Sequence, residues 1–129
     1  MARKQTRSSF ERTQGLGSAR EGVGHWWMQR VTALALIPLT LWFTASLIAR
    51  KRDDYGEFIL WLHHPFNCVV MVLLLVALFY HMALGLQVVV EDYVHNDRIK
   101  LPAVVVINLG CFALATAGII AALRIAFGR

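Results

Sequence analysis

The sequence predicts an all-α membrane protein with three transmembrane helices, and three observations lead to this prediction. Hydrophobic residues make up 57% of the 129 residues, and the mean hydropathy is +0.54. Charged residues account for 16%, whereas soluble domains carry about 25%. The charges cluster at the two termini and in two short stretches, which leaves three long apolar segments between them. A chain of this length is too short for a second domain.

Each apolar segment is long enough to cross a bilayer. A helix rises about 1.5 Å per residue, so about 20 residues span a hydrocarbon layer of roughly 30 Å. Lipid offers no partners to free backbone N–H and C=O groups, which favours helices. The expected helices run over about 26–49, 66–91 and 102–124. They form a transmembrane domain over 25–129, which follows an arm over 1–24. Because its helices face lipid, this domain is expected to pack in a helical bundle with helices of another chain.

The arm over 1–24 is rich in Arg and Ser and poor in acidic residues. A secretory signal peptide has an apolar core of about 7–15 residues close to the start, whereas here about 30 residues precede the first apolar segment. We interpret the segment as a basic cytoplasmic arm. Mitochondrial transit peptides have a similar composition, and this alternative stays open.

The distribution of Lys and Arg predicts that the N-terminus lies inside. Eight of these residues fall in the arm, at the start of the first helix and in the loop after the second, against five on the other side. Trp26 and Trp27 are expected in the inner aromatic belt, and Tyr55 and Trp61 in the outer one. The net charge of +5 therefore matches anionic lipid heads, and no nucleic-acid motif accompanies it.

His81 is the most informative residue within the apolar segments. It lies ten residues before Glu91, which is about 15 Å below the inner surface. An ionisable side chain at this depth is costly and indicates a functional site. Three interpretations remain open from spacing alone: a neutral His hydrogen-bonded across a helix interface, a proton relay, or a haem ligand.

Three neighbouring residues favour haem. Gly85 follows one turn later on nearly the same face, where a missing side chain lets a flat macrocycle approach. Arg30, at the inner end of the first helix, could meet a haem propionate. Asp92 lies eleven residues past His81, about three turns along the same face. Simpler alternatives exist for each: helix packing for Gly85, a topology charge for Arg30 and a helix-end acid for Asp92.

Two segments resemble a known family. The run HMALGLQ from His81, followed by Glu91-Asp92-Tyr93-Val94, resembles the small hydrophobic membrane anchor of succinate dehydrogenase, or respiratory complex II. The run GHWWMQRVTA over 24–33 is similar to the Gly/His…Arg-x-Thr/Ser-Ala segment of the same family. The resemblance covers about residues 22 to 125. The second-helix signature of the companion cytochrome b anchor, Ser-His-x-x-x-Gly-x-Arg-His, is absent.

The resemblance implies roles for individual residues. His81 would be one axial ligand of a b-type haem that is shared with a partner chain. Asp92 and Tyr93 would lie at the ubiquinone site, with the Tyr93 hydroxyl bonded to a quinone carbonyl. Arg30 and His25 would lie near the haem propionates. An interfacial aromatic remains the alternative for Tyr93.

The implied function is to anchor an enzyme complex in the bacterial cytoplasmic membrane, or alternatively in the mitochondrial inner membrane. The implied partners are the larger cytochrome b anchor, the iron–sulfur protein and the flavoprotein of the complex. The chain has no nucleotide fingerprint and no cysteine cluster. FAD and iron–sulfur clusters would therefore belong to the partners, and this chain would not be catalytic alone.

Two other functions are kept open: a fumarate reductase anchor of the same superfamily, and a non-redox assembly or transport protein that uses His81 as a proton or packing group. If haem is bound, its second axial ligand is expected from another chain. The other histidines lie toward the helix ends, away from the depth of His81. They are His25, His63, His64 and His95.

Overall fold

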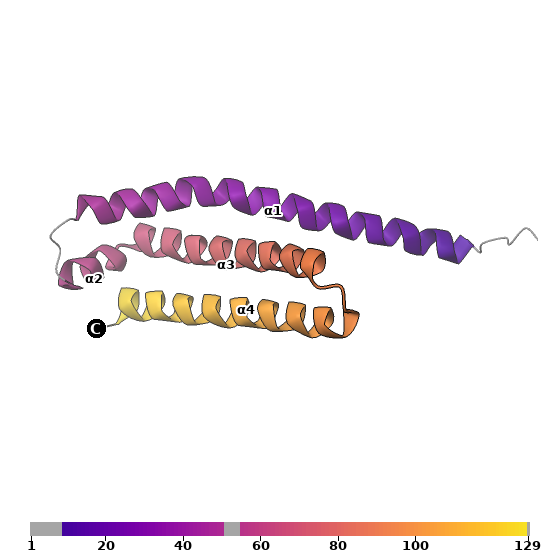
Figure 1. Ribbon diagram of the computed structural model, residues 1–129. Helices are drawn as coiled ribbons and strands as arrows, with labels where there is room; N and C mark the ends of the chain where they lie inside the picture. The colour runs from indigo at the N-terminus through magenta and orange to yellow at the C-terminus, as the bar shows by residue number, and fades with distance from the viewer. Residues whose placement is uncertain (1–8, 51–54, 129) are drawn as a thin grey trace, which may run out of the picture.

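The computed structural model describes residues 9–50 and 55–128, with side chains from Gly22 onward. The described chain forms helices α1 (Ser9–Ala49), α2 (Tyr55–His63), α3 (Pro65–Tyr93) and α4 (Asp97–Phe127), as Figure 1 shows. Within this part, three segments are long and apolar enough to span a membrane: Gly22–Ala49, Pro65–Tyr93 and Asp97–Phe127. The predicted all-α fold with three spans is confirmed.

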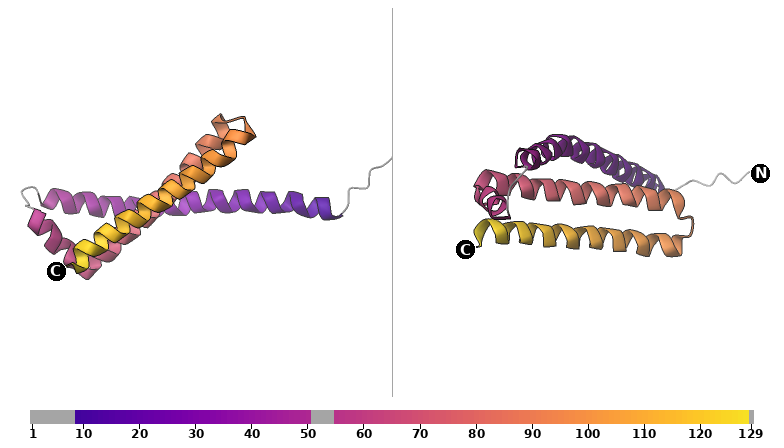
Figure 2. Two further views of the ribbon diagram at one scale, coloured as in Figure 1. Left: turned by 90° about the horizontal axis from the view of Figure 1, so that it is seen from below. Right: turned by 60° about the vertical axis from the view of Figure 1, so that its left-hand side comes forward.

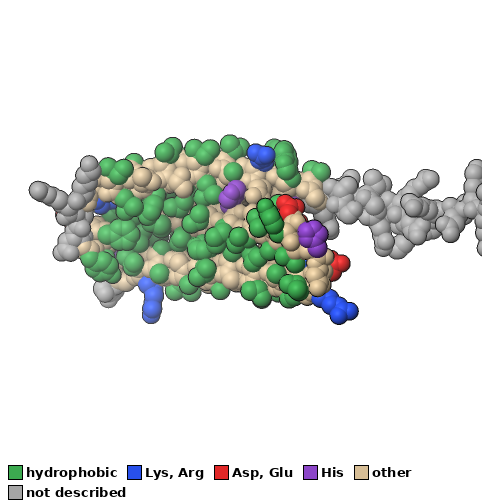
Figure 3. Space-filling view, viewed as in Figure 1, with side chains coloured by type: hydrophobic (Ala, Val, Ile, Leu, Met, Phe, Trp, Pro, Cys, Tyr) green, Lys and Arg blue, Asp and Glu red, His purple; other side chains and the backbone are tan. Residues whose placement is uncertain are grey.

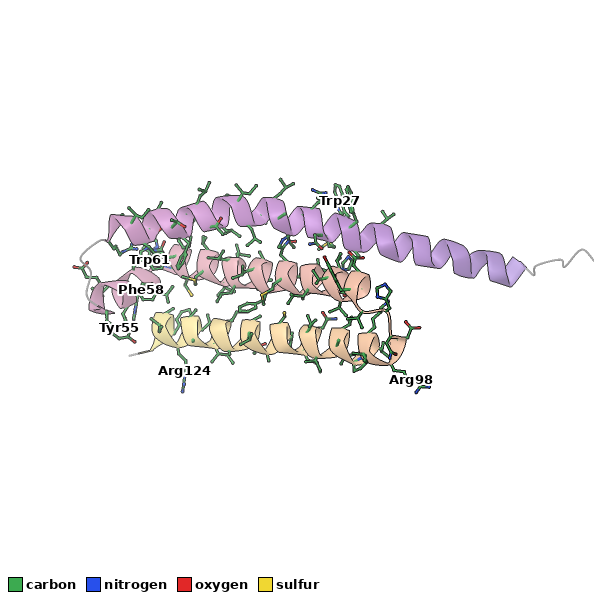
Figure 4. All side chains as sticks on the ribbon, viewed as in Figure 1. Trp27, Tyr55, Phe58, Trp61, Arg98 and Arg124 are labelled. Atoms are coloured by element: carbon green, nitrogen blue, oxygen red, sulfur yellow. The ribbon has the colours of Figure 1, made fainter. Side chains whose placement is uncertain are left out.

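Helix α3 is central, because it packs against both α1 and α4. Successive long helices run antiparallel, and α1 crosses the α3–α4 pair at an angle (Figures 1 and 2). The end of α3 and the start of α4 meet at one end of the bundle, here called the Arg98 end. Helix α2 and the end of α4 lie at the opposite end, here called the Trp61 end (Figure 4).

Helix α1 starts much earlier than expected. Its predicted start was about residue 26, but the helix begins at Ser9 and includes most of the segment predicted as an arm. No Pro precedes Pro38, so each added residue extends the helix by one backbone hydrogen bond. The hydropathy of the sequence identified only the part of α1 that can cross a lipid bilayer. A helix of 41 residues is about 60 Å long, and Figure 1 shows it projecting past the Arg98 end.

Helix α2 was not predicted, because at nine residues it is too short to span a membrane. It forms because Phe58, Trp61 and Leu62 fall on one side and pack against α3 and α4. Trp61 was expected in an interfacial belt, but it is buried and stacks on Trp42 at 5.2 Å between ring centroids. Tyr55 is exposed at this end, as a belt residue would be.

The ends of α3 and α4 follow local chemistry. Pro65 begins α3, where its missing N–H costs nothing, and the preceding His64 is extended. Asn96 caps α4, because its side-chain oxygen accepts a hydrogen bond from the Arg98 backbone N–H at 3.1 Å. Both helices continue slightly beyond their predicted ends, at Pro65–Tyr93 and Asp97–Phe127.

The main buried core lies at the Trp61 end. Its buried members are Trp61, Leu62, Cys68, Met71, Leu74, Ala122 and Ala126. The other half of the bundle has few buried side chains, among them Thr32, Leu84 and Cys111. Hydrophobic side chains cover most of the surface in Figure 3, and charged ones gather toward the ends. Such an exterior suits lipid or apolar partner helices.

Candidate functional site

His81 lies on α3 and faces α1. Its Nδ1 is 3.0 Å from the Thr32 hydroxyl oxygen. This contact joins α3 to α1 through two residues that are 49 positions apart in sequence. Thr32 is only 7% exposed, and its hydroxyl also lies 2.8 Å from the Met28 carbonyl oxygen. The hydrogen bond across a helix interface, one interpretation of His81, is therefore present. It engages one ring nitrogen and leaves Nε2 without a hydrogen bond to the described residues.

A cavity of about 490 Å³ brings together three residues that the sequence singled out. His81 lines it from α3, and His25 and Arg30 line it from α1. The Arg30 guanidinium lies 5.5 Å from the ring centroid of Trp26, which also lines the cavity. This contact is a cation–π interaction that restrains the long Arg side chain.

The Nε2 atom of His25 is buried and has no hydrogen-bond partner among the described residues. Buried polar atoms are nearly always hydrogen-bonded, so this unpaired ring nitrogen, in a residue that lines the cavity, indicates a missing partner such as a ligand group or a water molecule. The nearby positive charge of Arg30 favours an anionic group such as a carboxylate. An imidazole, a guanidinium and an unsatisfied buried nitrogen are groups that a haem with its propionates can engage.

The donor set also distinguishes haem from a bare metal ion. Among the described residues, no three His, Cys, Asp or Glu side chains gather as a metal site. A structural zinc ion requires about four protein ligands. Haem iron takes only axial ligands from the protein. The residues present therefore fit a haem better than a bare ion.

Gly85 faces α1 beside Gln29. A Cβ atom at Gly85 would lie 3.5 Å from the Gln29 side-chain nitrogen, and Gly85 is not among the residues that line the cavity. This contact supports the helix-packing interpretation of Gly85. Its proposed role in the approach of a macrocycle stays a prediction.

Asp92 and Tyr93 lie at the end of α3, apart from the cavity. Helix α3 continues without a break to Tyr93, which meets the condition for Asp92 to share a face with His81. Asp92 therefore lies about 16 Å from His81 along the axis of α3. Both side chains are exposed, Tyr93 by 79%. Their position at the Arg98 end leaves them available to a bound molecule or a partner chain.

Sequence reasoning missed Thr32, Gln29 and Trp26 as members of this site. Thr32 contacts His81, Gln29 packs on Gly85, and Trp26 holds Arg30. Spacing within one helix cannot show which residue of a second helix lies opposite. The only signal was that all three fall in the 24–33 run that also contains Arg30.

Comparisons with known proteins agree with a chain that spans a membrane. The family model of the succinate dehydrogenase/fumarate reductase transmembrane subunit matches residues 3–116. A succinate dehydrogenase hydrophobic membrane anchor subunit of Rickettsia conorii is 30% identical over 116 residues, which cover 89% of this chain and 92% of that protein. The protein of that name from Paracoccus denitrificans is 26% identical over 115 residues, 89% of this chain and 88% of the relative. A succinate dehydrogenase membrane anchor subunit of Reclinomonas americana is 28% identical over 94 residues, 70% of this chain and 78% of the relative.

No solved structure matches the chain. The family match includes the cavity residues of α1 and α3 together with Asp92 and Tyr93. With three apolar spans and this match over most of its length, the chain belongs to the family of succinate dehydrogenase and fumarate reductase transmembrane subunits.

Proposed function

We propose that this chain is a membrane anchor of a succinate:ubiquinone oxidoreductase, supplies one axial ligand to a b-type haem and forms part of the ubiquinone site. Family membership and the three spans support the anchoring role. The names of the relatives from Rickettsia conorii and Paracoccus denitrificans support succinate as the substrate of the complex. The proposed role in haem binding rests on the residues that line the cavity. The proposed role in quinone binding rests on Asp92 and Tyr93 at the Arg98 end.

One observation carries the haem proposal: a single cavity contains His81, Arg30 and His25. Residues from two helices meet there with complementary chemistry. Neutral imidazole is a common ligand of haem iron, and guanidinium pairs with carboxylates such as propionates. The unsatisfied Nε2 of His25 offers a further contact to a propionate.

Within the complex, a haem bound by His81 and Arg30 would supply a one-electron carrier. His81 presents its ring to the cavity, and Trp26 holds Arg30 beside it. Tyr93 donates its hydroxyl hydrogen to a quinone carbonyl and so orients the quinone at the Arg98 end. Asp92, one residue earlier, can accept a proton near the membrane surface.

The partners we propose are the larger cytochrome b anchor, the iron–sulfur protein and the flavoprotein of the complex. The flavin and the iron–sulfur clusters belong to those partners. The N-terminus and the Arg98 end face the cytoplasm of a bacterium, because Lys and Arg are in excess on that side. A mitochondrial inner membrane is the alternative location.

A fumarate reductase anchor is the second candidate, because the description of the matching family includes both enzymes. The direction of the reaction depends on the potential of the quinone and on the other proteins of the complex. A non-redox assembly or transport protein is the third candidate. A reduced-minus-oxidised spectrum of the purified complex separates it from the first two.

Replacing His81 with Ala tests the proposal. The purified complex should lose its b-type absorbance and most of its haem, because the iron loses an axial ligand. His63→Ala is the matched control, since His63 is an exposed histidine that contacts the Ile59 carbonyl of its own helix. Succinate oxidation with an artificial acceptor should persist in both variants. A His81→Ala complex with unchanged haem content and spectrum would refute ligation.

A further inference from the structure

We propose that Thr32 is a positioning residue whose hydroxyl holds His81 in the tautomer with Nδ1 protonated and Nε2 free for iron. This inference rests on the proposed role of His81 as a haem ligand. It goes further by naming the group that sets the orientation and protonation of that ligand.

The Thr32 hydroxyl has one hydrogen and three oxygen or nitrogen neighbours. Its oxygen lies 2.8 Å from the Met28 carbonyl oxygen, 3.1 Å from the Gln29 carbonyl oxygen and 3.0 Å from His81 Nδ1. Carbonyl oxygens only accept hydrogen bonds, whereas an imidazole nitrogen can donate or accept. The position of the one hydroxyl hydrogen therefore decides the tautomer of His81.

All three contacts are favourable if the Thr32 hydroxyl donates its hydrogen toward the carbonyl oxygens of α1. The hydroxyl hydrogen then lies between Thr32 and the two carbonyl oxygens, as is common for Thr within helices. A lone pair of the hydroxyl oxygen faces α3 and accepts a hydrogen bond from His81 Nδ1–H. If the hydroxyl donated to His81 instead, two carbonyl oxygens would face the hydroxyl oxygen at 2.8 and 3.1 Å with no hydrogen between them. That arrangement is repulsive.

The tautomer has a direct consequence for metal binding. A neutral imidazole with Nδ1–H has its lone pair on Nε2, which is the nitrogen without a hydrogen bond to the described residues. A hydrogen bond at Nδ1 also fixes the plane of the ring and strengthens the donation of electrons from Nε2 to a metal. Thr32 is 7% exposed, so water has little access to replace its hydroxyl.

Thr40 shows that the contact to His81 is a separate feature of Thr32. On the same helix, the Thr40 hydroxyl donates to the Leu36 carbonyl at 2.6 Å and lies 3.1 Å from the Ile37 carbonyl. Thr40 is exposed, and these two contacts stay within α1. Both threonines thus make the same kind of hydrogen bonds within α1, and Thr32 makes an additional one to α3. Thr40 is a matched control.

The experiment compares three variants in the complete complex purified from membranes. Thr32→Val removes the hydroxyl and keeps the shape, Thr32→Ser keeps the hydroxyl, and Thr40→Val removes only bonds within the helix. The measurements are haem per flavin, haem dissociation, the reduced-minus-oxidised spectrum and the haem midpoint potential. Succinate oxidation with an artificial acceptor reports assembly.

Thr32→Val should bind haem about 10- to 100-fold more weakly, as is typical when the partner of a metal-bound His is lost. The haem that remains should have a higher midpoint potential, because an imidazole that donates electrons less strongly stabilises ferric iron less. Thr32→Ser should restore both properties, and Thr40→Val should match the wild type.

Wild-type haem content, dissociation and potential in Thr32→Val would overturn the inference and leave ligation by His81 intact. A Thr32→Ser complex that behaves like Thr32→Val would also overturn it, because the hydroxyl would then be irrelevant. If Thr32→Val fails to assemble, Thr32→Ala makes the same test without a branched side chain. Haem retained unchanged in His81→Ala would refute the proposed ligation itself, and this inference with it.

Discussion

Tyr93 and Tyr80 make a matched pair on α3. Tyr93 ends the helix and is 79% exposed, whereas Tyr80 lies one residue before His81 and is 44% exposed. Of these two tyrosines, only Tyr93 lies at the Arg98 end. A quinone bound there would contact both the membrane and the water-soluble proteins of the complex. The proposed function assigns the quinone contact to the Tyr93 hydroxyl, so removing that hydroxyl alone tests the assignment.

Tyr93→Phe should lower quinone reduction by succinate about tenfold, which corresponds to the loss of one hydrogen bond worth about 1.4 kcal/mol. Haem content and succinate oxidation with an artificial acceptor should stay at wild-type levels. Tyr80→Phe controls for loss of a Tyr hydroxyl elsewhere on the helix. If quinone reduction in Tyr93→Phe equals that of the wild type, Tyr93 is only an interfacial aromatic.

At the scale of helices, α3 and α4 approach closely at Gly118. A Cβ atom at Gly118 would lie 3.4 Å from a methyl carbon of Leu75, at the limit of comfortable packing. Gly110, two turns earlier on α4, has no atom within 4 Å of the corresponding position among the described residues. The two glycines therefore differ in packing although they share a helix and an apolar sequence context.

Gly118→Leu should destabilise the α3–α4 pair by about 1–3 kcal/mol, because a larger side chain must displace Leu75. Gly110→Leu should have a much smaller effect. Thermal unfolding of the purified complex in detergent measures the difference as a shift in Tm. Equal Tm values for the two variants would show that the close approach at Gly118 does not limit packing.

The whole molecule is unevenly packed. Its core gathers at the Trp61 end, where Arg50 lies 4.5 Å above the ring of Trp61 and α2 closes the bundle. The half that contains the cavity exposes large apolar side chains on α1 and α3, including Trp26, Leu34 and Val89. A haem needs cover on both faces, so for a haem bound in this cavity we expect a partner chain to supply the second wall.

The isolated chain should therefore fail to form a six-coordinate haem, and co-expression with the second anchor should restore it. Within the chain, His25 is the residue to test as an alternative second ligand, because it lines the same cavity as His81. It lies seven residues before Thr32, about 10 Å along α1 from the level of His81. Haem titration into membranes that contain this chain alone measures the outcome.

A bis-histidine, low-spin spectrum from the isolated monomer would contradict this expectation. If that spectrum then disappeared in His25→Gln, His25 would be the second ligand. In the co-expressed complex, His25→Gln should keep a low-spin haem, because the proposal places His25 at the propionates and assigns the second iron ligand to the partner.

Much of the fold was predictable because lipid imposes simple rules. A span needs about 20 apolar residues in a helix, so hydropathy located α3 and α4 and the apolar part of α1. The depth of His81 in the membrane, which stays a prediction, comes from counting residues along one helix. Position and spacing indicated Arg30 and Asp92 as candidates, and the family motifs added His25 and Tyr93. Each of these inferences uses distances along the chain, which the sequence contains.

Tertiary structure alone decided which residues meet. The burial of Trp61 depends on stacking with Trp42 of α1, and α2 depends on packing against α3 and α4. The partnership of Thr32 with His81 and of Gln29 with Gly85 depends on how α1 rotates and crosses against α3. Periodicity gives the faces of one helix but leaves its rotation against a neighbour open, because lipid accepts many apolar faces equally well. Packing between helices selects one of them, and that choice created the cavity.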